Sequence, residues 1–118
     1  MGLDDVILEV DNKSLSNRPD LWGHYGIARE LAAIYKVPLK ELNTELPKGV
    51  PEYPTTIKEP ERCNRFTATK IENVYVKESP AWMKTLITNA GMRPINALLD
   101  ITNFVLLAVG QPQHAYDS

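Results

Sequence analysis

The sequence of 118 residues is poor in the features that mark several large classes of protein. It has one cysteine, Cys63, so neither an internal disulfide framework nor a cysteine-based metal cluster is expected. Lysine and arginine number 13 against 15 aspartate and glutamate, and this formal charge of −2 gives no general basic surface for nucleic acid. The longest apolar run, Phe104–Val109, is far shorter than the roughly 20 residues that span a bilayer. We therefore expect a cytoplasmic, reduced protein without membrane contact.

Signatures of common catalytic sites are also missing. The sequence has no glycine-rich phosphate loop and no serine nucleophile elbow. Neither of its histidines, His24 and His114, has a second histidine at a helical spacing, so no metal site is expected. Cys63 lies in strand-like sequence without a nearby histidine, which favours an inert thiol. Any chemistry must therefore come from a less familiar arrangement of residues.

The hydrophobic pattern predicts three helices. The first follows Asp20, a candidate N-cap, and ends before Val37–Pro38. The second begins at Ser79–Pro80, with the serine as candidate cap, and ends at Gly91. The third runs over Asn96–Val109 with its first residue as the cap, and its second half is apolar on nearly every side.

Four short segments are rich in β-branched or aromatic residues, which favours strands. They are Val6–Val10, Tyr53–Lys58, Arg65–Ile71 and Val74–Val76. Together with the helices they predict an α+β fold class, with three main helices and four or five short strands.

A proline-rich span divides the sequence. Five prolines and one glycine occur between Pro38 and Pro60, and such a composition is typical of a linker. We predict boundaries at 1–42, 43–60 and 61–118, with the linker in the middle.

Polar residues inside the third predicted helix are the most informative feature. Asp100, Thr102 and Asn103 interrupt an apolar segment, and burying them is costly unless they are hydrogen-bonded or face a wet pocket. Two interpretations stay open: a structural hydrogen-bond network or a functional site. Arg93 precedes this helix and His114 follows it, so the two converge only if the chain folds back, which spacing alone does not show.

Several motifs together resemble the beta subunit of bacterial phenylalanyl-tRNA synthetase. The first two correspond to an N-terminal signature of that subunit and the others to its editing module. In order they are Asn17–Asp20, Gly26–Ala33, Gly91–Asn96, Asp100–Asn103 and Gly110–Asp117. Their order and intervals agree with the family over nearly the whole chain.

The resemblance implies a place for each part of the chain. Residues 1–42 would be the C-terminal part of a small helical N-terminal domain, and 61–118 the first half of the editing module, with a partial editing-domain fold. The family subunit is several times longer, so we expect this chain to be a fragment. It pairs with an alpha subunit in a heterotetramer that uses ATP and magnesium to attach phenylalanine to tRNA(Phe). Those cofactors would act outside this segment.

The resemblance also implies roles for five residues. His114 would orient the water or the ester during hydrolysis of mischarged Tyr-tRNA(Phe), and Arg93 would hold the terminal nucleotide or stabilise charge. Thr102, Asn103 and Pro112 would form the wall of the editing pocket. The groups that recognise the tyrosine hydroxyl come later in the family sequence.

Two functional hypotheses follow. The first is that the chain forms part of an editing site, which is incomplete in this segment. The second is a non-catalytic module of the same synthetase that binds tRNA or assembles subunits. An independent small hydrolase is disfavoured because no nucleophile–base pair is found.

Overall fold

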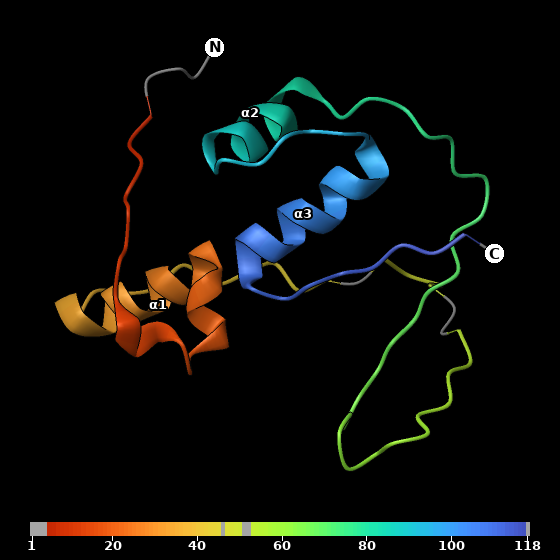
Figure 1. The fold of residues 1–118 in the computed structure, drawn as a ribbon, viewed down its shortest axis with the longest axis horizontal. Helices are drawn as coiled ribbons and strands as arrows, with labels where there is room; N and C mark the ends of the chain where they lie inside the picture. The colour runs from red at the N-terminus through yellow and green to blue at the C-terminus, as the bar shows by residue number, and fades with distance from the viewer. Residues whose placement is uncertain (1–4, 46, 51–52, 118) are drawn as a thin grey trace. The chain divides into compact units, whose positions relative to one another are not determined.

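The computed structural model describes residues 5–45, 47–50 and 53–117. Pro51 of the predicted linker lies outside these ranges, as do the outermost residues of the two predicted domains. The described residues form three α-helices, preceded by two 3-10 helices (Figure 1). In chain order these are η1 Lys13–Leu15, η2 Pro19–Trp22, α1 His24–Tyr35, α2 Ala81–Asn89 and α3 Ala97–Val109.

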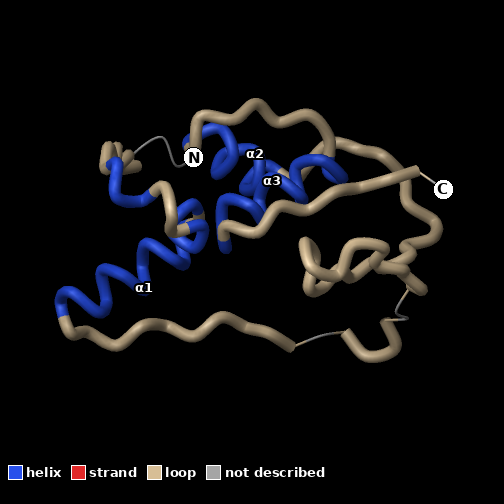
Figure 2. The backbone as a smooth tube through the Cα atoms, turned by 60° about the horizontal axis from the view of Figure 1, so that its bottom comes forward, coloured by secondary structure: helices blue, strands red, loops and turns tan. Residues whose placement is uncertain are grey.

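The prediction of an α+β fold with four or five strands is wrong. No strand occurs among the described residues, where helices alternate with irregular chain (Figure 2). Two predicted strands do meet: the Tyr53 amide donates to the Ala68 carbonyl at 3.0 Å, and the Thr55 hydroxyl to the Phe66 carbonyl at 3.5 Å. One backbone hydrogen bond is not a ladder, and an isolated pair of strands is marginal in water.

The first predicted strand shows the physical reason most clearly. Val6, Ile7, Leu8 and Val10 lie in irregular chain with side chains between 57% and 81% exposed. A β-branched sequence fits a pleated, half-buried surface, but it becomes a strand only where a partner supplies the hydrogen bonds. The described residues contain no such partner for this segment.

Contacts along the chain define two units. One comprises residues 1–40 with 76–118 and contains the three helices, and the other comprises residues 41–75. The second unit holds most of the proline-rich span. The predicted boundaries at 1–42, 43–60 and 61–118 stay a prediction.

Helices α2 and α3 pack against each other in the first unit and carry its two fully buried side chains, Ile87 and Asp100. Met83 and Ile87 of α2 are buried, the latter completely. Trp82 and Phe104 pack edge to face, with ring centroids 5.6 Å apart and an interplanar angle of 86°. The Ala97 amide at the start of α3 donates to the Lys77 carbonyl at 2.8 Å. These contacts hold the two helices and the chain before α2 as one body.

The start of α1 meets the end of α3 through glycine. A Cβ atom at Gly23 would lie 2.2 Å from the Gly110 nitrogen, so no other residue fits there without a shift of backbone. Gly110 has φ +76° and caps α3 in the left-handed conformation, donating to the Leu106 carbonyl at 2.8 Å. The His24 Nδ1 donates to the Leu107 carbonyl at 2.7 Å. Close backbone approach at the two glycines and the hydrogen bond from His24 thus join α1 to α3.

The N-cap of one α-helix matches the sequence prediction, and the N-caps of the other two differ from it. Asn96 caps α3 as predicted, its side chain accepting from the Leu99 amide at 3.0 Å. Asp20 does not cap α1, because the chain first completes η2 and the helix begins after the extended residue Gly23. Ser79 does not cap α2 either, since Pro80 occupies that position and the serine hydroxyl points to another partner.

Candidate functional site

Helix α3 and its two flanking segments carry all five residues predicted to form a site. Thr102 and Asn103 are half-buried on the helix itself. Arg93 is exposed in the loop between α2 and α3, and Pro112 and His114 are exposed in the segment after Gly110. That segment reverses direction at the end of α3 and runs back the way the helix came, as both views show (Figures 1 and 2). The chain therefore makes the reversal that convergence would need.

The five side chains are nevertheless not linked to one another by polar or aromatic interactions among the described residues. Within the described part of the chain, no hydrogen bond, ion pair or ring contact joins any two of them. Thr102 donates to the Leu99 carbonyl at 2.7 Å, and the His114 ring lies 6.3 Å from the Tyr116 ring at an angle of 41°. Neither of these interactions brings two of the predicted site residues together.

Asp100 is the polar residue of α3 that is buried. Its relative exposure is 1%, and its two carboxylate oxygens have separate partners. The Ser79 hydroxyl donates to Oδ2, and the Ile95 amide donates to Oδ1 at 2.8 Å. Ser79 is itself 4% exposed. For Asp100 the structure therefore supports the hydrogen-bond network, one of the two interpretations left open by the sequence.

A hollow of about 210 Å³ lies next to this network. At the edge of this hollow Lys84 forms an ion pair with Glu78, and the distance from Nζ to Oε2 is 2.5 Å. The hydrogen bond from Lys84 holds the pKa of Glu78 below its usual range. The hollow is lined by Glu78, Ser79, Lys84, Pro94, Ile95 and Asp100. None of the five predicted site residues lines it, although Pro94 directly follows Arg93.

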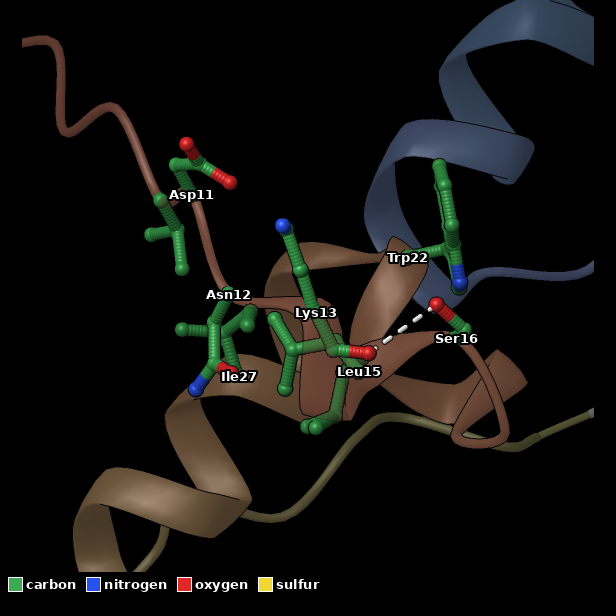
Figure 3. A pocket seen from close by; sticks show the side chains of 9 residues that line it. Asp11, Asn12, Lys13, Leu15, Ser16, Trp22 and Ile27 are labelled. Atoms are coloured by element: carbon green, nitrogen blue, oxygen red, sulfur yellow. Dashed lines mark hydrogen bonds between the residues drawn. The ribbon is translucent and has the colours of Figure 1, made fainter.

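A second hollow, of about 420 Å³, opens beside the turns before α1 (Figure 3). Its rim includes η1, where the Ser16 hydroxyl donates to the Lys13 carbonyl at 3.1 Å. Trp22 borders it and is 69% exposed. Its lining residues are Val10, Asp11, Asn12, Lys13, Leu15, Ser16, Leu21, Trp22 and Ile27. The sequence analysis predicted no site at these residues, and the one usable signal was the neighbouring apolar residues Leu21 and Trp22.

An ion-pair cluster connects the first signature to α1. The Arg18 guanidinium forks onto both oxygens of Asp20 at 3.0 Å and also reaches Glu30 at 3.0 Å. Arg29 donates to Asp20 at 2.7 Å. Hydrogen bonds from Arg18 and Arg29 hold the pKa of Asp20 well below its ordinary value, and those to Asp20 and Glu30 raise the pKa of Arg18. The cluster explains why the two motifs occur together: it ties η2 to the first turns of α1.

The described residues contain no group of three or more His, Cys, Asp or Glu side chains arranged to hold a metal ion. No helix among them has the length and apolar character needed to cross a membrane.

Comparison with known proteins gives a consistent result. The B3/4 domain family matches residues 62–118, a range that includes all five predicted site residues. The phenylalanine–tRNA ligase beta subunit of Solibacter usitatus is 46% identical over 97% of this chain, and that of Gloeobacter violaceus is 46% identical over 100%. The corresponding protein of Fusobacterium nucleatum is 42% identical over 99% of the chain. The chain spans about 15% of the length of each of these relatives.

Proposed function

We propose a function from the premise that this chain belongs to the family of bacterial phenylalanine–tRNA ligase beta subunits. In that setting the chain contributes to a site that hydrolyses Tyr-tRNA(Phe), the product of charging the tRNA with the wrong amino acid. One observation carries the proposal: the B3/4 match takes in Arg93, Thr102, Asn103, Pro112 and His114, all of which lie on α3 or on the segments next to it.

The need for such a site follows from the chemistry of the two amino acids. Tyrosine is phenylalanine with one added hydroxyl, and an apolar pocket rejects an added hydroxyl by only about 100-fold. A second site that hydrogen-bonds the phenol discriminates in the opposite direction, because phenylalanine would leave its buried polar groups unpaired at a cost of about 1–3 kcal/mol each. Hydrolysis at that site removes the errors of the first.

The reaction breaks the ester bond between tyrosine and the terminal adenosine of the tRNA, with water adding to the ester carbonyl. His114 orients the attacking water or the ester by hydrogen bonding. Arg93, a permanent cation with a planar fork of donors, binds the nucleotide end or stabilises the developing oxyanion. Both side chains are exposed, which suits contact with a large substrate. Thr102, Asn103 and Pro112 form the wall of the pocket.

The proposal for the whole enzyme is broader. The beta subunit pairs with a catalytic alpha subunit, binds tRNA(Phe) and works in the cytoplasm as part of protein synthesis. ATP and magnesium serve the ligation reaction, which takes place outside this segment. The carboxylates described above do not form a group that fits a metal ion.

A specific observation favours a second candidate, a module for subunit assembly or tRNA binding without hydrolysis. In the unit that contains the three helices, several large apolar side chains are exposed, among them Trp22 and Tyr35, which are 69% and 71% exposed. Exposed apolar surface of this kind is typical of regions that other protein covers.

Substitution of His114 distinguishes the two candidates. In the ligase assembled from full-length subunits, His114→Ala is expected to slow Tyr-tRNA(Phe) hydrolysis by about 10–1000-fold while leaving charging with phenylalanine near normal. The matched control is His24→Ala, the same change at the other histidine of the chain, whose ring donates a hydrogen bond to the Leu107 carbonyl of α3. Measured deacylation of preformed Tyr-tRNA(Phe) by the wild type and both variants provides the comparison. A wild-type hydrolysis rate in His114→Ala would leave the assembly module as the better function.

A further inference from the structure

We infer that Asp100 is a positioning residue for the proposed hydrolysis, acting through the loop that carries Arg93. The inference rests on the proposed function and adds to it a residue to which the sequence assigned no role in the reaction.

The position of Asp100 rules out direct contact with substrate. Its side chain is 1% exposed, and each carboxylate oxygen already accepts a hydrogen bond, one from Ser79 and one from Ile95. A carboxylate so enclosed has no free oxygen to offer a water or an ester. It does connect three pieces of chain: the segment before α2, the loop before α3, and α3 itself.

The loop that bears Arg93 is held at both of its ends. At the α2 end, the Gly91 amide donates to the Thr88 carbonyl at 2.9 Å and the Met92 amide to the Ile87 carbonyl at 3.0 Å. At the α3 end, the Ile95 amide donates to Asp100 at 2.8 Å. Between these anchors lie only Arg93 and Pro94.

These anchors fix the backbone of Arg93 while its side chain stays exposed. The Pro94 ring fixes one backbone dihedral of the short span and restricts the residue before it. A guanidinium that acts on a substrate needs such support, because a misplacement of about 1 Å can lower a rate by about 100-fold. Loss of the Asp100 carboxylate would release the α3 end of the loop and leave the Ile95 amide without its acceptor.

Three variants of the assembled ligase test the inference. Asp100→Ala is expected to lower kcat for Tyr-tRNA(Phe) hydrolysis by about 10–100-fold. Asp100→Asn keeps an oxygen acceptor for the Ile95 amide, and the Ser79 hydroxyl can turn to accept from the new amide, so its rate should stay within about threefold of the wild type. The matched control is Asp20→Ala, which removes a carboxylate of the same unit that is far from Arg93 along the chain. This variant should hydrolyse Tyr-tRNA(Phe) at the wild-type rate.

A double substitution separates positioning from general stability. If Asp100 acts through Arg93, then Asp100→Ala should cost little further rate in an enzyme that already carries Arg93→Ala. A merely structural role predicts instead that the two losses multiply. Hydrogen exchange at the Ile95 amide gives a readout independent of activity, and it should become faster in Asp100→Ala and stay slow in Asp100→Asn.

The outcomes distinguish the inference from the proposed function. Faster exchange together with a non-additive loss of hydrolysis supports the inference. Any of three results overturns the inference and leaves the proposed function standing. These are losses that multiply in the double variant, wild-type hydrolysis by Asp100→Ala, and equal losses in Asp100→Ala and Asp100→Asn. A wild-type enzyme that does not hydrolyse Tyr-tRNA(Phe) overturns the proposed function, and the inference with it.

Discussion

Two aspartates each join a helix to chain that lies outside it, and they do so in opposite environments. Asp20 links η2 to α1 through guanidinium groups, and its side chain remains 30% exposed. Asp100 links two segments to α3 through a hydroxyl and a backbone amide, and it is 1% exposed. Charges near water are screened and stabilise little, whereas a buried carboxylate depends on every donor it has.

The difference indicates what holds each region. Around Asp100, the hydrogen bonds themselves fix the loop, because no solvent replaces a lost donor. Around Asp20, the backbone of η2 lies directly on α1, where a Cβ atom at Gly26 would come within 1.7 Å of the Asp20 carbonyl oxygen. We infer that the close approach at Gly26 stabilises this junction more than the ion pairs do.

Removal of the Ser79 hydroxyl should have the largest effect on stability. Ser79→Ala leaves the buried Asp100 carboxylate with one donor fewer, which is expected to cost about 1.5–3 kcal/mol. Hydrogen exchange of the α3 amides in the beta subunit measures the change in local opening free energy. The control is Thr85→Ala, which removes a hydroxyl of α2 bonded only within its own helix and should change this free energy by less than about 0.5 kcal/mol. Equal effects of the two variants would contradict the importance given to burial.

An alanine at Gly26 sharpens the other side of the comparison. Gly26→Ala is expected to destabilise the η2–α1 junction by up to about 2 kcal/mol, since overpacking costs about 1–3 kcal/mol and the gain in helix propensity offsets about 1 kcal/mol. Exchange of the α1 amides is the measurement. A net stabilisation would mean that η2 moves away at little cost, and the close approach would then not be what holds the junction.

The Asp20 ion pairs should give the smallest effect, with a characteristic dependence on pH. Because Arg18 and Arg29 lower the pKa of Asp20 in the folded state, its contribution is present above the unfolded pKa of about 4 and is lost as the pH falls below it. The midpoint of urea unfolding, followed by tryptophan fluorescence, should therefore differ between wild type and Asp20→Asn at pH 7 and converge toward pH 2.

Salt provides the control for that variant. At an ionic strength of about 1 M the Debye length falls to about 3 Å, so the difference at pH 7 should shrink. Expressed as a free energy, the effect of Asp20→Asn at pH 7 should also be less than about half of the loss caused by Ser79→Ala. A difference that persists unchanged at pH 2 and at high salt would mean that Asp20 stabilises the junction by something other than charge.

Helix positions were largely predictable from the sequence because their signals are local. The cap of α3 by Asn96 and its termination at Gly110 depend on residues within one turn of the helix ends. The predicted strands failed for the complementary reason: Val6–Val10 has suitable residues, but strand formation depends on a partner at a distance along the chain.

The candidate site divides in the same way. From the sequence, motif identity and order along the chain predict Arg93, Thr102, Asn103, Pro112 and His114 as site residues through the resemblance to the family, and this assignment stays a prediction. The sequence also showed that the polar residues of α3 needed partners, but it left open which ones.

Only the tertiary structure decided that Asp100 binds Ser79 and Ile95, and that the chain after Gly110 turns back along α3. The serine was assigned to a helix cap from the sequence, because capping is the common local use of that residue before a helix. The physical reason is that burial removes water as a competing partner, so a hydroxyl and a carboxylate 21 residues apart find each other only once the helices have packed.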